Sequence, residues 1–141
     1  MQFMMEQARA FTWGMQPTLA NYHSFLFDER KDEMDYLVDI IKTRYNALDY
    51  LLYGELRELP DLPCEEMTIP ISRVSIYAGR LRSTVTRAEK KVKTLYSSVW
   101  LSKGGDAGIA LSNISGEPSE VSLKVDSKKY GIPSSGKVNL I

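Results

Sequence analysis

Few side chains in this sequence are of types that carry out chemistry, and their spacing matches no recognisable catalytic or metal-binding motif. His23 is the single histidine and Cys64 the single cysteine among 141 residues. A metal site needs several ligands, and a nucleophile needs a base beside it, so neither residue indicates such a site. We expect no metal and no catalytic residues. His23 is interpreted as a loop or surface histidine and Cys64 as a buried structural thiol.

The glycines do not form a phosphate-binding loop. Gly14 and the Gly104-Gly105 pair lack the Lys-Ser/Thr ending and the strand–loop–helix context that a nucleotide site requires. We therefore expect no cofactor.

Charge is balanced overall but unevenly distributed. Lysine and arginine total 18, as do aspartate and glutamate. This balance lacks the basic surface of a nucleic-acid binder or a polybasic membrane anchor, so nucleic acid and membrane are not expected partners. Acids crowd the stretch from Asp28 to Asp39 and bases the stretch from Arg80 to Lys93. We interpret these stretches as two solvated faces that attract each other.

Neither an export signal nor a membrane span is predicted. The first ten residues have no basic start followed by an apolar core, and no apolar run reaches about eighteen residues. We expect a soluble chain.

The first third of the sequence is predicted to be helical. We expect a short helix over Met1–Arg9, an extended piece over Phe11–Met15 and a long helix over Lys31–Tyr53. In the long helix, acids occupy the first turns and apolar residues recur at three- and four-residue spacing. That stripe consists of Met34, Leu37, Val38, Ile41, Tyr45, Leu48 and Leu52. An amphipathic helix needs a surface to pack on. The proline-bearing stretch Leu56–Cys64 is predicted to be a linker or the boundary between two lobes.

Beyond residue 65 the apolar period changes to two, which is typical of strands. The Lys103–Asp106 stretch, with two glycines, predicts a tight hairpin turn. Candidate strands are Glu66–Ile71, Val74–Tyr77, Arg82–Ala88, Lys93–Leu101, Gly108–Ile114, Glu120–Val125 and Lys137–Ile141. The predicted fold is α+β, with an N-terminal helical segment (residues 1–60) packed on a C-terminal antiparallel β-sandwich (residues 61–141).

Two groups of motifs carry a resemblance to a known family. The first is ARAFTWGMQPT (residues 8–18) followed by the helix end RYNALDYLLYGEL (residues 44–56). The second is VWL (99–101), ALSNI (110–114) and YGIP (130–133). Together they resemble the last strand and helix of a bacterial glycoside-hydrolase (β/α) barrel and the β-sandwich that follows it. The resemblance covers nearly the whole chain.

This resemblance implies a non-catalytic accessory region of a carbohydrate-active enzyme. Glycoside hydrolysis needs two carboxylates about 5 to 10 Å apart. A barrel has eight strands, and this chain has room for one strand–helix unit, so the catalytic acids would lie on strands outside it. The family allows an exported parent protein.

Trp13 and Gln16 are the candidate substrate-binding residues that the resemblance implies. They would lie at the C-terminal end of the last barrel strand, where such enzymes bind substrate. An indole stacks on the apolar face of a sugar, and an amide hydrogen-bonds its hydroxyls. The alternative is that Trp13 packs under the long helix and Gln16 caps a turn. Trp100 is interpreted as part of the sandwich core.

Two further functions stay open beside the accessory role. One is a weak sugar-binding module that uses Trp13 and Gln16. The other is an oligomerisation or interaction module, because the tyrosines and aliphatic residues of the long helix would form an uncovered apolar surface without the rest of a barrel. That surface predicts a homodimer through the helical segment.

Overall fold

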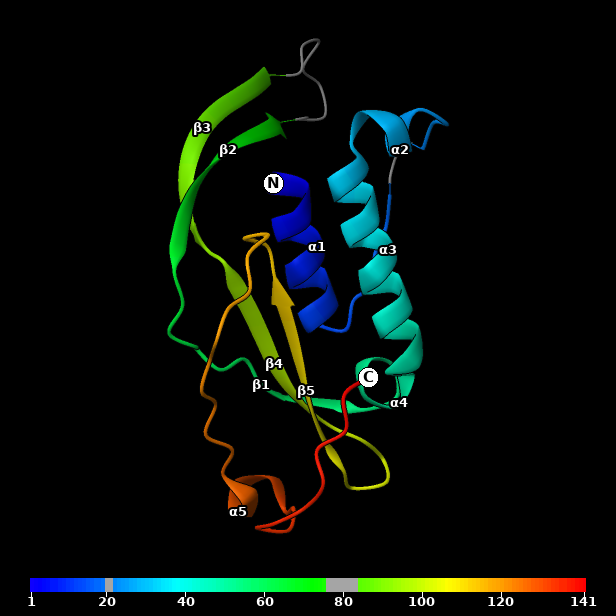
Figure 1. Cartoon of the computed structure of the whole chain (residues 1–141), viewed down its shortest axis with the longest axis vertical. Coiled ribbons are helices and arrows are strands. Elements are labelled where there is room, and N and C mark those ends of the chain that lie inside the picture. The colour runs from blue at the N-terminus through cyan, green and yellow to red at the C-terminus, as the bar shows by residue number, and fades with distance from the viewer. Residues whose placement is uncertain (20–21, 76–83) are drawn as a thin grey trace.

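The structure is a computed structural model that describes residues 1–19, 22–75 and 84–141. It has an α+β fold with helices and antiparallel strands, as the sequence predicts. Figure 1 shows that helix α1 (Gln2–Thr12) lies between the strands and helix α3 (Lys31–Asn46). The described strands form two sheets that are not closed into a complete sandwich. The division into segments at residue 60 stays a prediction.

Helix α1 is the centre of the core because its apolar side chains point to several elements at once. Met5 and Ala8 belong to one buried cluster, together with Ile69, Val92 and Ile114 of the strands and the loop that follows them. Phe11 belongs to a second cluster around Trp100. The short helix α2 (Leu26–Glu29) and the start of α3 form a third cluster, against which Phe3 packs.

The predicted extended piece over Phe11–Met15 is wrong, because α1 continues to Thr12. Ala8 and Phe11 are three residues apart and are both buried, so the apolar stripe of the helix outweighs the strand preference of the aromatic residues. The Thr12 hydroxyl also donates to the Ala8 carbonyl oxygen at 3.1 Å. The strand that the barrel resemblance implies is therefore not formed here.

The long predicted helix begins at Lys31 as expected but breaks at Ala47, and α4 (Leu48–Leu51) follows. Met34 and Leu37 of the predicted stripe are buried. Three other members of the stripe are exposed: Ile41, Tyr45 and Leu52. The buried face of α3 includes Ile40, which packs in one cluster with Phe11 of α1, so the exposed members of the predicted stripe lie beside this buried face.

Strands β2 (Glu66–Ser75) and β3 (Thr84–Lys93) form a two-stranded antiparallel ribbon. The register runs from the Glu66–Lys93 pair to the Ser75–Thr84 pair. One strand thus replaces the predicted Glu66–Ile71 strand and the first part of the predicted Val74–Tyr77 strand. The remainder of that prediction, and the start of the predicted Arg82–Ala88 strand, lie outside the described residues.

The second sheet has the strand order β1-β4-β5, with β4 (Leu95–Leu101) in the middle. The hairpin from β4 to β5 (Ala107–Asn113) confirms the predicted turn, in which Gly105 has a φ of +89°. Strand β1 (Glu55–Glu58) overlaps the start of the stretch Leu56–Cys64, which is predicted to contain no strand. That part of the linker prediction is wrong, because the β1 backbone pairs with the free edge of β4.

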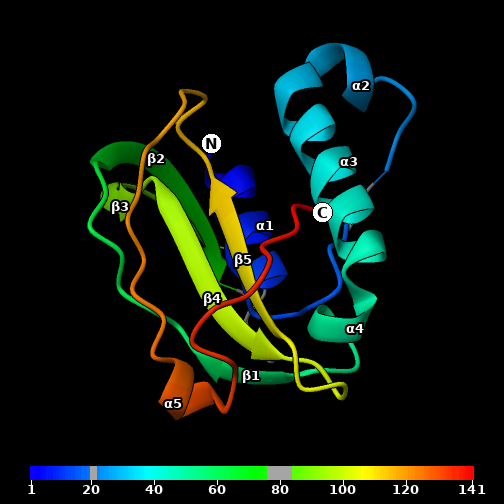
Figure 2. The same cartoon turned by 60° about the horizontal axis from the view of Figure 1, so that its bottom comes forward.

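The predicted strands Glu120–Val125 and Lys137–Ile141 are not formed. Between them lies α5 (Ser127–Tyr130), which Figure 2 shows beside β1. Val138 and Leu140 are 90% and 97% exposed. Alternating apolar residues form a strand only where another strand offers its backbone groups, and in this structure neither segment has such a partner.

Candidate functional site

Trp13 and Gln16 lie on the turn that follows α1, and both side chains are exposed. The Trp13 ring is 45% exposed, with the Arg9 guanidinium 5.3 Å from the ring centroid. Trp13 therefore does not pack under α3, which was the alternative interpretation. The two side chains share one exposed turn, and the sugar-contacting role stays a prediction.

The turn itself is held by its backbone groups and by one side chain of α3. Gly14 has a φ of +71°, and the Met15 N–H donates to the Ala10 carbonyl oxygen at 2.8 Å. Arg44 donates to the carbonyl oxygens of Gly14 at 3.1 Å and of Met15 at 3.3 Å. The turn is thus fixed against the C-terminal end of α3.

Trp100 is a core residue, as the sequence predicts. It is 6% exposed, and its indole N–H donates to the Ser98 hydroxyl at 2.8 Å and to the Thr12 carbonyl oxygen at 3.3 Å. A buried indole whose N–H is bonded inside the protein leaves no stacking face for a sugar.

Exposed apolar side chains are carried by three segments that meet: the 13–16 turn, the C-terminal half of α3, and the residues that follow α4. The contacts of Arg44 join the turn to α3, and Gly14 lies against the Leu51 carbonyl oxygen of α4. We call these side chains the helical-end patch: Trp13, Met15, Ile41, Tyr45, Leu52 and Tyr53. Their exposed fractions run from 45% to 75%. Apolar groups collected in this way are typical of a docking surface.

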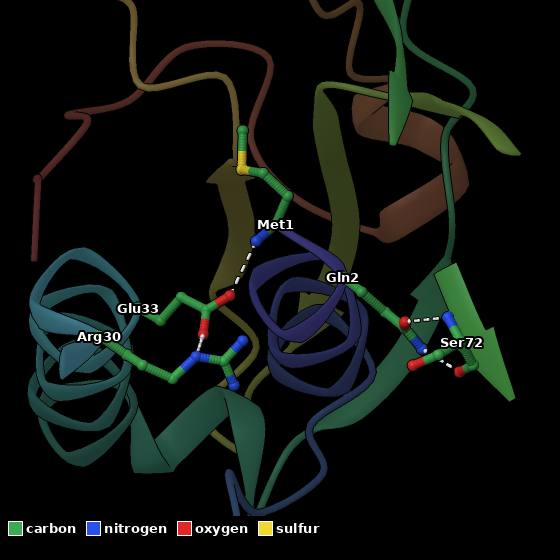
Figure 3. A network of polar contacts seen from close by, with 5 residues as sticks. All are labelled: Met1, Gln2, Arg30, Glu33 and Ser72. Carbon is green, nitrogen blue, oxygen red and sulfur yellow. Dashed lines mark hydrogen bonds and ion pairs between the residues drawn. The ribbon is translucent and has the colours of Figure 1, made fainter. Parts of the chain in front are cut away.

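A cavity of about 500 Å³ lies at the other end of α1, between α1, the start of α3 and the β2–β3 ribbon. Figure 3 shows the contacts that surround it. The Gln2 side-chain amide donates to the Ser72 carbonyl oxygen at 3.0 Å and accepts from the Ser72 N–H at 2.7 Å. Glu33 pairs with the Met1 ammonium at 2.8 Å and with Arg30 Nε at 3.1 Å. These contacts hold the start of α1 against β2 and α3.

The carboxylates of this cavity are engaged and do not form an acid–base pair. Glu33 faces two cations, and Glu6 accepts a hydrogen bond from the Gln2 amide at 3.0 Å. The sequence offered no signal for these contacts, since Gln2 and Ser72 are 70 residues apart.

The basic stretch does not pair with the acids of residues 28–39 in the described part of the chain. Lys91 pairs with Glu66 at 2.7 Å, and Lys93 pairs with Asp61. Arg30 and Glu33 pair with each other within the acidic stretch. In the described residues these charges pair across the β2–β3 ribbon, with the segment before β2 and within the helices, while Arg80 and Arg82 of the basic stretch lie outside the described residues.

A polar cluster at the C-terminal end joins α5 to β1. Glu58 accepts from Lys129 Nζ at 2.6 Å and from the Tyr130 hydroxyl. The Lys129 and Tyr130 hydrogen bonds lower the pKa of Glu58, and the bond to Glu58 raises the pKa of Tyr130. The Asp126 carboxylate also caps α5 by accepting from the Lys128 and Lys129 N–H groups. The cluster anchors the C-terminal segment.

The remaining chemical candidates behave as isolated residues. His23 is exposed, with its ring 6.3 Å from that of Phe25. Cys64 is half-buried and not fully buried as expected, with its thiol 4.0 Å from the Leu95 carbonyl oxygen. Within the described ranges, no three His, Cys, Asp or Glu side chains are grouped to hold a metal ion. None of the helices in those ranges has the length and apolar character to span a membrane.

Comparisons with known proteins give no relative. No family model matches the chain, and no curated protein or solved structure is significantly similar to it.

Proposed function

We propose that this chain is a non-catalytic accessory region of a carbohydrate-active enzyme of the glycoside-hydrolase type. In this proposal the helical-end patch docks against the catalytic barrel, and the chain itself supplies no catalytic group. The family assignment rests on the sequence resemblance alone, and on its β-sandwich half above all, because Phe11 and Thr12 are helical. The docking role rests on the surface of the chain.

The observation that carries the docking role is the half-covered apolar stripe of α3. Met34 and Leu37 are buried, whereas Ile41 and Tyr45 are 45% and 75% exposed on the same amphipathic helix. Apolar side chains that stay exposed beside a buried helix face are typical of an interaction site. We infer that a partner surface covers the apolar side chains of Ile41 and Tyr45, which the core of the single chain leaves exposed.

The total surface of the chain supports the same inference. The chain has a mass of 16.0 kDa and an accessible surface of 10583 Å². A compact monomer of this mass exposes about 7,400 Å². The surplus of roughly 3,000 Å² exceeds the ~800 Å² that each partner contributes to a standard interface. The chain therefore has enough uncovered surface for a partner to dock.

The experiment is a calorimetric titration of this chain into a purified (β/α) barrel encoded in the same reading frame or operon. We expect a 1:1 complex that Tyr45→Lys abolishes. The matched control is Asp39→Lys, which places the same charge on another face of α3 and keeps the complex. The proposal is overturned if no such barrel is encoded there, or if the barrel binds both variants equally.

A second candidate is weak sugar binding, and the exposure of Trp13 and Gln16 on one turn favours it. The test is calorimetry of the chain with a panel of soluble oligosaccharides. Sugar binding that is lost in Trp13→Ala and kept in Tyr45→Lys supports this candidate. The absence of binding heat across the panel rejects it.

A further inference from the structure

The outer edge of β5 lacks the features that normally prevent strand addition. Strand β5 ends the order β1-β4-β5, so in the described part of the chain this edge has no neighbouring strand. Its sequence, AGIALSN, contains neither a charge nor a proline. Strands β1, β2 and β3, which all have a free edge, carry charged residues, and β2 also contains Pro70. Proteins protect exposed edges with such residues, so an unprotected edge indicates a place where another strand adds.

The face beside this edge is also only half covered. Ile109 and Leu111 lie directly opposite Val99 and Ser97, so all four side chains are on one face of the sheet. Val99 is 2% exposed, whereas Ile109 and Leu111 are 43% and 46% exposed. The Ser97 hydroxyl donates to the Pro60 carbonyl oxygen at 2.8 Å, which places the segment before β2 against β4. This segment covers β4 and leaves Ile109 and Leu111 of β5 exposed.

The segment Lys137–Ile141 has the properties of the missing strand. Val138 and Leu140 alternate with polar residues, at the same two-residue spacing as Ile109 and Leu111. They are 90% and 97% exposed, so the folded single chain gives them no apolar contact. A strand that adds to an edge gains backbone hydrogen bonds along the ladder and burial of every second side chain.

We propose that Lys137–Ile141 of a second copy of this chain adds to the outer edge of β5. Val138 and Leu140 then cover Ile109 and Leu111, and reciprocal exchange closes a two-fold dimer. A second copy is the source because the single chain leaves this segment unpaired. In addition, Tyr130 and Lys129 anchor α5 to Glu58 of β1, which is the opposite edge strand of the sheet. This dimer is independent of the helical-end patch.

The experiment measures the oligomeric state of the full chain by sedimentation equilibrium at micromolar concentration. We expect a dimer that Leu140→Lys weakens about tenfold or more, because a buried leucine is lost from each exchanged strand. The matched control Asn139→Lys adds the same charge one residue away, on the other face of the segment, and keeps the dimer. Both variants are expected to melt as the wild-type monomer does, because both positions lie outside the core.

Mixing two variants identifies the source of the strand. Ile109→Lys damages the receiving edge and Leu140→Lys damages the added strand, so each is expected to be monomeric alone. Native mass spectrometry of the mixture is expected to show a heterodimer, in which the intact strand of one chain meets the intact edge of the other. A monomeric wild type, a dimer insensitive to Leu140→Lys, or a mixture without heterodimer overturns the proposal.

Discussion

Gly14 is the residue at which the backbone conformation and the packing of the core meet. Its φ of +71° disfavours side chains, and a Cβ there would lie 2.6 Å from Trp100 Cη2 and 2.8 Å from the Leu51 carbonyl oxygen. We expect Gly14→Ala to lower the free energy of unfolding by about 2 to 4 kcal/mol, since strain and overpacking add. Urea denaturation measures this change.

Gly105→Ala is the matched control for that prediction. Gly105 also has a positive φ, of +89°, but nothing lies within 4 Å of the added Cβ. Its cost is therefore backbone strain alone, about 1 kcal/mol. If the two substitutions lowered the free energy of unfolding equally, the close approach of Gly14 to Trp100 would be contradicted.

The two tryptophans are expected to respond differently to the same substitution. Trp100→Phe removes the indole N–H and leaves the fully buried Ser98 hydroxyl without its donor, which costs about 1 to 3 kcal/mol. Trp13→Phe keeps an exposed aromatic ring and is expected to change stability by less than about 0.5 kcal/mol. Thermal melting of the two variants checks this difference, and a similar loss in both would reject the assignment of Trp100 to the core.

At the scale of elements, the contact between α5 and β1 is expected to depend on pH at both extremes. Hydrogen bonds from Lys129 and Tyr130 lower the pKa of Glu58 below its value in the unfolded chain. The contact is therefore complete above the ordinary carboxyl range and is lost as the pH falls through the lowered pKa. The bond to Glu58 raises the pKa of Tyr130, so the contact is also lost as the pH rises through that raised pKa.

Amide exchange at Gly131, just after α5, measures this anchor. Tyr130→Phe removes the phenol that ionises, so we expect the alkaline loss of protection to lose the part due to Tyr130 and to keep the part due to deprotonation of Lys129, whose pKa the bond to Glu58 raises. The loss of amide protection at low pH is expected to remain, because Lys129 still bonds to Glu58 in that variant. Identical profiles for the two proteins at high pH would show that the phenol does not hold α5.

The elements that sequence predicts correctly are those defined by local signals. The start of α3 at Lys31 follows from acids and apolar spacing, and the β4–β5 hairpin follows from the glycines of Lys103–Asp106. The Phe11–Met15 prediction is wrong because burial of Phe11 against distant Trp100 decides its helical state. Lys137–Ile141 has a strand pattern, but a pattern does not supply the neighbouring strand.

At the scale of the whole molecule, long-range polar contacts fix how the layers meet. The Gln2–Ser72 pair joins α1 to β2, and the hydroxyls of Tyr36 and Ser112, 2.7 Å apart, join α3 to β5. Their partners are 70 and 76 residues apart, so no spacing rule in the sequence identifies them. The sequence singled out Trp13 and Gln16 but placed Trp13 in a strand and not in the turn after α1, and it gave no indication of the cavity at the start of α1.

The surface area of the chain leads to a prediction about its unfolding. An unfolded chain of 16.0 kDa exposes about 23,000 Å², of which the fold hides a little over half. A compact domain of about 150 residues hides roughly 68 to 70%. Because the urea m-value scales with the area exposed on unfolding, we expect about four-fifths of the value for a compact protein of this length.

The m-value is best measured with the Leu140→Lys variant, because Leu140 is 97% exposed and its replacement leaves the fold of the single chain unchanged. Circular dichroism in urea measures the m-value. A docked partner is expected to raise the m-value, because it hides the helical-end patch in the folded state. The small buried area also predicts marginal stability for the isolated chain, since apolar burial is the main term that opposes chain entropy. An m-value equal to that of a compact protein would contradict the exposed surface on which both docking proposals depend.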